Sequence, residues 1–229
     1  TSQGYYDAKV TDILADYCVR NAPGMPLGSF YGYKTGGVNP ETGELIYLDT
    51  NEDGEVTAND RTYMGDPNPD FTFGMTNTFQ FYGVTISFLL QGSYGNDVFN
   101  ASRIETEGMY DAKNQSIRVL DRWRRPGMIT SIPKAGFDMK VSDYFVEDGS
   151  YIRLKDLTIG YEFSGNWMKK IGMTRLQPYF SAQNLFTLTK YLGMDPEVNQ
   201  YGNSGTVQGL DYGTYPQTRS FVLGVNIAF

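Results

Sequence analysis

Histidine is absent from this chain of 229 residues, and cysteine occurs only once, as Cys18. Without an imidazole the chain cannot build a histidine-ligated zinc site or a Ser-His-Asp catalytic triad. A lone cysteine can form neither an internal disulfide nor a thiolate metal cluster. Composition alone therefore excludes several large classes of enzyme and metal site.

Basic charge and long apolar runs are also scarce. The chain carries 19 Lys and Arg against 26 Asp and Glu, which gives a net charge of −7. This charge repels phosphate backbones, and the basic run at residues 122–125 is too short to offset it, so we expect no nucleic acid partner. No apolar run reaches the length of about 18 residues that a membrane-spanning helix requires.

Aromatic residues, by contrast, are abundant. Tyr occurs 18 times, Phe 14 times and Gly 26 times, although the mean hydropathy is only −0.40. Aromatic-rich and Gly-rich chains with interleaved polar residues are typical of β-sheets that have one wet face and one apolar face. The composition therefore predicts an all-β fold.

Alternation of apolar and polar residues predicts the strands. Between residues 70 and 81, five of six odd positions are apolar and no even position is, which is the period of a strand with one apolar face. A turn at Tyr82 and Gly83 leads into a second run, so the two form a long hairpin. The alternation returns in three later segments, 156–163, 175–188 and 220–229. Residues 28–33 show it more weakly and are a sixth candidate strand.

The phase of this alternation changes near Lys155. A β-bulge at this point would explain the change, because one extra residue moves the following side chains to the other face. Two further segments have helical spacing, and we expect short helices at residues 9–19 and 112–124.

The connections between the strands differ greatly in length. In an antiparallel sheet the short connections fall at one end and the long ones, at about 34–69, 95–149 and 189–217, fall at the other. Transmembrane β-barrels sort their loops in this way, with the long ones outside the cell. The alternative is a soluble, Gly-rich β-sandwich whose aromatic faces pair inward.

One local motif has the spacing of a calcium loop. Oxygen-bearing side chains fall at positions 1, 3, 5 and 12 of a twelve-residue segment, glycine falls at position 6, and a backbone carbonyl is available at position 7. We expect structural calcium here, with extended rather than helical flanks. The alternative is an acidic turn without metal. The expected ligands are Asp49, Asn51, Asp53, the carbonyl of Glu55, and Asp60.

No catalytic constellation is found, and we expect no enzyme. Asp138, Asp143, Glu147 and Asp148 could be paired on paper, but they lie in a segment with Lys and Gly. We interpret them as solvated charges on a loop.

Together the motifs resemble a known family, the SusC/RagA-type TonB-dependent outer-membrane transporters, and specifically the C-terminal segment of their barrel. The resemblance covers most of the chain from Gly28 onward, whereas residues 1–27 match less well and are left unassigned. It is carried by the order of these segments: Gly-Ser-Phe-Tyr-Gly-Tyr at 28–33, the loop at 49–60 with Arg61, Gly-Asp-Pro-Asn-Pro-Asp-Phe at 65–71, Arg-Trp at 122–123 with Pro-Gly at 126–127, Asp-Gly-Ser-Tyr-Ile-Arg-Leu-Lys-Asp-Leu-Thr-Ile-Gly-Tyr at 148–161, Asn-Leu-Phe-Thr-Leu-Thr-Lys-Tyr at 184–191, Asp-Pro-Glu at 195–197, Tyr-Pro at 215–216, Arg219 and Gly-Val-Asn-Ile-Ala-Phe at 224–229.

The resemblance implies a large plugged barrel in the outer membrane of a Gram-negative bacterium. Such transporters import glycans or peptides with energy passed from TonB, and a SusD-like surface lipoprotein caps their extracellular face. Barrels of this kind have about 22 strands, so this chain, with residues 28–229 as barrel strands and extracellular loops, is expected to be a fragment or one chain of a split transporter. A secreted, calcium-stabilised β-domain that binds glycans is the alternative function.

The expected orientation follows from the same patterns. The resemblance implies that Phe229 closes the barrel and is part of the signal read by the outer-membrane assembly machinery. Substrate-binding residues cannot be assigned. The lipid bilayer is expected to contact the apolar set Phe71, Phe73, Phe79, Val84, Ile86, Phe88, Leu157, Ile159, Phe163, Phe221, Leu223, Val225 and Ile227.

Overall fold

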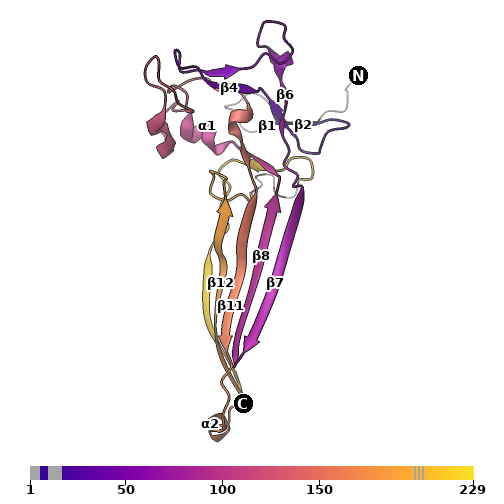
Figure 1. Ribbon diagram of the computed structural model, residues 1–229, viewed down its shortest axis with the longest axis vertical. Coiled ribbons are helices and arrows are strands. Elements are labelled where there is room, and N and C mark those ends of the chain that lie inside the picture. Colours follow the sequence, from indigo (N-terminus) through magenta and orange to yellow (C-terminus); the bar gives the residue numbers. More distant parts are fainter. Residues whose placement is uncertain (1–5, 10–16, 199, 201, 203) are drawn as a thin grey trace.

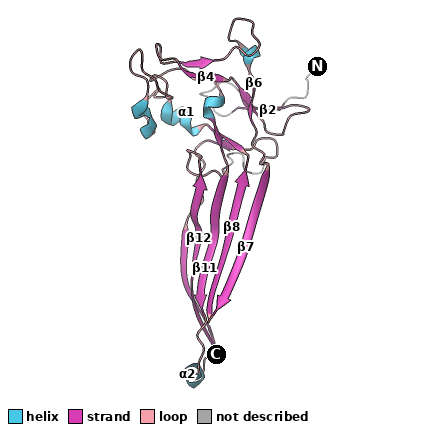
Figure 2. Cartoon of the chain, in the orientation of Figure 1, coloured by secondary structure: helices cyan, strands magenta, loops and turns pink. Residues whose placement is uncertain are grey.

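The computed structural model describes residues 6–9, 17–198, 200, 202 and 204–229. It has two parts, a long twisted sheet and a head at one end of that sheet (Figure 1). We use the name head for the described residues of 6–69, 95–150 and 190–219. Figure 2 shows that the helical turns lie in the head or at the far tip of the sheet.

The long sheet has five antiparallel strands in the order β14-β12-β11-β8-β7. These are the five strands that the alternation predicts. Their bounds are β7 Phe71–Phe81, β8 Val84–Tyr94, β11 Tyr151–Tyr161, β12 Arg175–Thr189 and β14 Ser220–Ala228.

A two-residue turn joins β7 to β8, as predicted. Tyr82 and Gly83 both have positive φ, 48° and 83°, the geometry that matches a tight hairpin to the twist of its strands. The turn sets the register in which Phe81 faces Val84 and Phe71 faces Tyr94. Every apolar position of β7 therefore shares a face with the even positions of β8.

The predicted bulge is present in β11. Its pairing shifts between Leu154 and Asp156 against both β8 and β12, which leaves Lys155 outside the regular register. On the β12 side the irregularity includes Asn184, which has a φ of 51°. Residues three apart in a regular strand point to opposite faces of the sheet. Because the bulge adds one residue, Leu154 and Leu157 lie on the same face, opposite Leu90 and Phe88 of β8.

The sheet therefore has one mainly apolar and one mainly polar face, with Leu89 and Val222 as apolar exceptions on the polar face. Cross-strand partners on the first are apolar, such as Ile159 with Ile86 and Phe180, and partners on the second are polar, such as Thr158 with Ser87 and Ser181. The edge strands β7 and β14 are largely exposed on both faces.

The head is built from small sheets and short helical turns. One sheet has the order β1-β2-β3-β6, another the order β10-β9-β13, and β4 pairs with β5. The bounds are β1 Tyr6–Lys9, β2 Tyr17–Asn21, β3 Phe30–Gly32, β4 Thr35–Val38, β5 Leu45–Tyr47, η1 Ala58–Asp60, β6 Thr62–Gly65, β9 Asp97–Asn100, α1 Ser102–Glu107, η2 Ile117–Asp121, η3 Asp143–Phe145, β10 Val146–Asp148 and β13 Leu210–Asp211.

Residues far apart in the sequence meet in the core of the head. The rings of Phe30, Phe99 and Phe145 are fully buried and pack in series, with centroid distances of 5.8 Å for each contact. Leu210 and Cys18 belong to the same buried cluster. The segments expected to be three long loops, together with β2, thus fold around one apolar core.

Three sequence predictions need correction. The short helix expected at 112–124 is confined to the five-residue 3-10 turn η2, and Ile117 and Leu120 are 80% and 59% exposed, so the apolar spacing there does not reflect packing. A helix at 9–19 is also wrong in its described part, because Lys9 belongs to β1 and 17–19 to β2, while 10–16 lie outside the described residues. The sixth strand candidate, 28–33, contains β3, which pairs with β2 and β6 in the head rather than with the long sheet.

At the end opposite the head, a short helix interrupts the connection between β11 and β12. This helix, α2, spans Asn166–Lys170 and lies at the tip of the molecule beside the last strand (Figure 1). Among the described residues, no helix has both the length and the apolar character needed to span a membrane.

Candidate functional site

An ion cluster lies on the polar face of the sheet where it meets the head. Arg153 of β11 is 2% exposed, although it lies on the polar face of the sheet between its cross-strand partners Gln91 and Thr187. Its Nε donates to Thr187 Oγ1 at 2.9 Å, its Nη1 donates to Glu197 Oε2 at 2.8 Å, and its Nη2 pairs with Asp195. Charge-assisted bonds of this kind are directional, so the guanidinium fixes the position of both carboxylates.

This cluster holds the segment after β12 over the polar face. Asp195 also accepts from the backbone N–H groups of Glu197 and Gln217, both at 2.9 Å. Glu197 lies 3.4 Å from Lys155 Nζ. Two segments of the family resemblance, residues 148–161 and Asp-Pro-Glu at 195–197, are thus bonded to each other. No sequence pattern predicts this contact, because the two segments lie about forty residues apart and share no period.

A second ion cluster is buried in the head. Arg103 of α1 donates to Glu107 Oε2 at 2.9 Å and pairs with Glu147 Oε1 at 3.1 Å, while Arg118 lies 2.9 Å from Glu107 Oε1. Tyr144 donates its hydroxyl to Glu107 at 3.0 Å, and burial followed by the Glu107 charge raises the pKa of that hydroxyl. Each carboxylate is compensated by a guanidinium, so the cluster acts as a structural lock.

From the sequence alone, the four acidic residues of 138–148 are interpreted as solvated charges on a loop. This interpretation is wrong for Asp143 and Glu147. Glu147 has a side chain that is 9% exposed and pairs with Arg103, and Asp143 accepts from the Thr35 hydroxyl at 2.6 Å. The spacing of Arg103 and Glu107, an i,i+4 pair on one helix, is the one part of the cluster that the sequence could have revealed.

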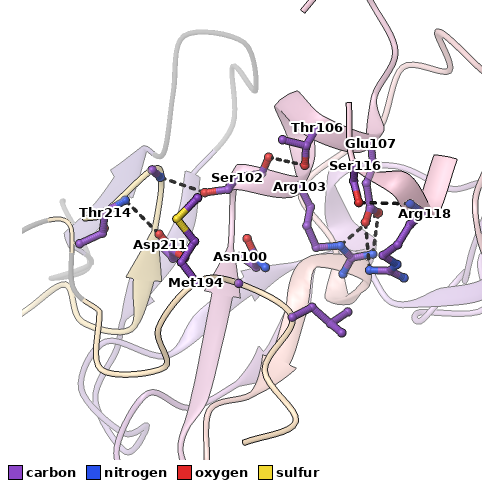
Figure 3. Close-up of a pocket in the computed structure, with 13 residues that line it drawn as sticks. Asn100, Ser102, Arg103, Thr106, Glu107, Ser116, Arg118, Met194, Asp211 and Thr214 are labelled. Atoms are coloured by element: carbon purple, nitrogen blue, oxygen red, sulfur yellow. Dashed lines mark hydrogen bonds and ion pairs between the residues drawn. The ribbon is translucent and has the colours of Figure 1, made fainter. Parts of the chain in front are cut away.

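Next to this cluster lies a cavity of about 250 Å³ between α1, η2 and the segment that carries Met194 (Figure 3). Asn100 and Thr214 line this cavity. Asn100 Oδ1 and Thr214 Oγ1 are both buried and have no hydrogen-bond partner in the described part of the chain. Asp211 closes one side and accepts from Tyr191 Oη at 2.6 Å. Burial and then this carboxylate raise the pKa of Tyr191. The cavity combines paired charges with the apolar side chain of Met194, an arrangement suited to binding rather than to proton transfer.

The expected calcium loop connects β5 to β6, so its flanks are strands, in agreement with the prediction. Asp49 accepts from Gly54 N at 2.7 Å and Asp53 accepts from Glu55 N at 3.0 Å, which wraps the backbone around the side-chain oxygens. Asn51 donates to Asp53 at 2.9 Å. No group of three or more His, Cys, Asp or Glu side chains is arranged for a metal in the described residues.

Asp60, at the twelfth position, is fully buried and forms a capping box at η1. Its carboxylate accepts from Thr57 N and Thr50 N at 2.7 and 2.8 Å. These bonds, that from Thr57 foremost, lower the pKa of Asp60. The donor chemistry of the loop, three carboxylates and a side-chain amide, fits a hard cation, although the oxygens of Asp60 already accept backbone hydrogen bonds.

Phe229 follows β14 and is 85% exposed at the end of the sheet opposite the head. The apolar face beside it is exposed as well. Phe221, Leu223 and Val225 are 61%, 84% and 55% exposed, which leaves this face of the sheet without a cover in the described chain.

No family model matches the chain. Comparisons with curated sequences and with solved structures nevertheless agree on one family. TonB-dependent receptor P3 of Formosa agariphila is 31% identical over all of this chain and 24% of that receptor. The TonB-dependent receptor SusC of Bacteroides thetaiotaomicron is 28% identical over 90% of this chain and 20% of that receptor.

The fold agrees with these relatives. The structure of the RagAB peptide transporter superposes with a TM-score of 0.77 at 22% identity, over 93% of this chain and 24% of the matched one. The chain spans a quarter or less of the curated relatives that it matches. It belongs to the SusC-type TonB-dependent receptors, of which it is a segment.

Proposed function

We propose that this chain is the C-terminal portion of a TonB-dependent importer in the outer membrane of a Gram-negative bacterium. The five long strands form part of the barrel wall, and the head forms part of the extracellular face that receives the substrate. The relatives are receptors and transporters rather than enzymes, which supports a role in transport without catalysis and does not favour a secreted β-domain.

The observation that carries this proposal is the two-faced sheet. A sheet with an uncovered apolar face and unpaired edge strands is unstable in water, whereas in a barrel the apolar face contacts lipid and the edges pair with further strands. Strands of 9 to 15 residues have the length that a tilted strand needs to cross the bilayer.

The polar face then lines the lumen, and the Arg153 cluster lies where a substrate passes from the head into the barrel. The substrate class is glycans or peptides, and the related RagAB assembly is described as a peptide transporter. A SusD-like lipoprotein would contact the head. TonB would act through parts of the receptor outside this chain.

We propose further that the loop of 49–60 binds calcium through Asp49, Asn51, Asp53, the Glu55 carbonyl and Asp60. The oxygen spacing and the bend at Gly54, with its φ of 91°, support this assignment. The cation would neutralise acidic side chains that face one another and would stiffen the link between β5 and β6.

Phe229 would close the barrel and contribute to the signal recognised by the assembly machinery. Its exposure and the uncovered apolar face of β14 beside it support this role. Deleting Phe229 from the full-length receptor is expected to lower the outer-membrane level of folded receptor more than its synthesis. Unchanged outer-membrane levels would contradict the assignment.

The orientation is tested by epitope insertion in the full-length receptor. A tag in the exposed turn between β4 and β5, after Glu41, should bind antibody on intact cells. The same tag after Lys170 of α2 should bind only after the outer membrane is permeabilised. Equal labelling of both tags on intact cells would contradict the proposal.

A further inference from the structure

The end of the sheet opposite the head carries aromatic and basic side chains together. We call Tyr161, Phe163, Trp167, Ile171 and the lysines 169 and 170 the far-end patch. All four apolar members are exposed, from 38% for Phe163 to 54% for Ile171. Both lysines are exposed too, in the last turn of α2.

The aromatic rings of the patch form a continuous column. The ring of Tyr161 meets that of Phe163 edge to face at 4.7 Å, and Phe163 meets Trp167 in the same manner at 6.2 Å. Tyr161 pairs with Val84 on the apolar face of the sheet. The column therefore extends the apolar face beyond the end of the strands.

The backbone around α2 holds this column in place. Gly165 has a φ of 147°, and a Cβ there would lie 2.9 Å from the ring of Trp167. Met168 is buried at 4% exposure under the turn. The backbone N–H of Phe163 donates to Leu176 O at 3.0 Å and that of Thr174 donates to Ala228 O at 2.8 Å. The connection is thus tied to both β12 and β14, and Trp167 is positioned rather than loose.

The charge of this connection is opposite to that of the whole chain. Residues 161–175 contain three basic residues and one acidic residue, in a protein of net charge −7. The single acid, Glu162, lies 3.6 Å from Arg175. The charges of Lys169 and Lys170 are therefore left for a partner outside this connection.

We propose that the far-end patch binds the glycerophospholipid leaflet of the membrane, with the aromatic column at the interface and Lys169 and Lys170 on anionic headgroups. The proposal rests on the proposed function, which places this end at the periplasmic side. Amphipathic aromatic rings settle at the boundary between hydrocarbon and headgroups, and basic residues near an anionic surface each add to its attraction. A lipid occupant fits better than a protein, because the column continues a face that contacts lipid.

The test uses the full-length receptor purified in detergent and supplied with phosphatidylglycerol or phosphatidylcholine, with retained lipids counted by native mass spectrometry. Wild type should retain phosphatidylglycerol in excess. Lys169→Gln with Lys170→Gln should reduce that retention about 30-fold and leave phosphatidylcholine unchanged. The matched control, Lys140→Gln with Lys190→Gln, removes two exposed lysines from the other end of the sheet and should change neither.

Trp167→Ala should reduce retention of both lipids, and Trp167→Phe should preserve it. Equal retention of the two lipids by wild type, or equal phosphatidylglycerol loss in the patch and control variants, would overturn the patch proposal and leave the barrel assignment standing. Retention of neither lipid by wild type would also overturn the patch proposal, whereas the barrel assignment is tested separately by the two epitope tags.

Discussion

The sheet and the head place the same kind of residue in opposite surroundings. Phe71 and Phe79 of the sheet are 54% and 52% exposed, whereas Phe30, Phe99 and Phe145 of the head are completely buried. One chain thus contains a region that buries its apolar side chains within itself and a region that turns them outward. This difference is what the proposed barrel requires, because it would place water around the head and hydrocarbon around the sheet.

The two regions also differ in where they place their charged residues. The head buries Arg103 and Glu107 as partners in one network, and the sheet directs Arg153 to its polar face, where it pairs with carboxylates from the segment after β12. The described apolar face of the long strands carries no cross-strand ion pair. In both clusters the buried guanidinium is paired with carboxylates, which offsets the cost of removing its charge from water.

The largest effect is expected when the ion lock of the head is broken. Arg103→Ala leaves the buried carboxylates of Glu107 and Glu147 short of a partner, which typically costs about 3–5 kcal/mol. Limited proteolysis of the full-length receptor should show a destabilised head beside strands that still resist heating in detergent. Lys113→Ala, which removes an exposed ion pair, should change stability by less than about 1 kcal/mol. Similar losses in both variants would contradict the account of the head.

The aromatic residues themselves can separate the two regions. Phe99→Ala removes a fully buried ring and should cost the head about 3–5 kcal/mol. Phe79→Ala, on the outward face of β7, leaves no internal cavity, because lipid can fill the space, so its cost should be clearly smaller. Chemical denaturation of the full-length receptor in detergent measures both changes. A larger loss for Phe79 would indicate that this face packs against protein.

The strands of the sheet could be predicted from the sequence because alternation and turn formation depend on residues that are neighbours in the chain. A strand between two different solvents must alternate, and the alternation at 70–81 and the phase change near Lys155 both appear in the structure. The turn at Tyr82 and Gly83 was predictable for the same reason, since a two-residue hairpin depends on the residues in the turn.

The head could not be predicted in the same way. Its core joins Phe30, Phe99 and Leu210, which lie in strands of two to four residues, too short for a clear period. Residues 112–124 show how this misleads: the apolar spacing there suggests a helix, yet the chain offers no surface for it to pack on, and only the five residues of η2 are helical. The contact of Arg153 with Asp195 and Glu197 depends on the path of a long connection, which local sequence does not encode.

A smaller effect is expected in the loop of 49–60. Asp49→Ala with Asp53→Ala should make the chain between Lys34 and Pro69 several-fold more sensitive to protease in the presence of calcium, because the loop would lose two expected ligands. The long strands should be unaffected. Glu41→Ala with Glu52→Ala removes the same charge without touching a ligand and serves as the control. If added calcium and chelator give the same cleavage rate in wild type, the calcium assignment is wrong.

Adjacent residues of β14 test the two-faced sheet most directly. Val225 lies on the apolar face opposite Pro178, and Asn226 lies on the polar face opposite Gln177. An arginine on a lipid-facing position costs about 2–4 kcal/mol near the middle of the bilayer. The folded, heat-modifiable receptor in isolated outer membranes should therefore fall sharply for Val225→Arg and stay near the wild-type level for Asn226→Arg. Equal levels of the two variants would contradict the assignment of this sheet to a barrel wall.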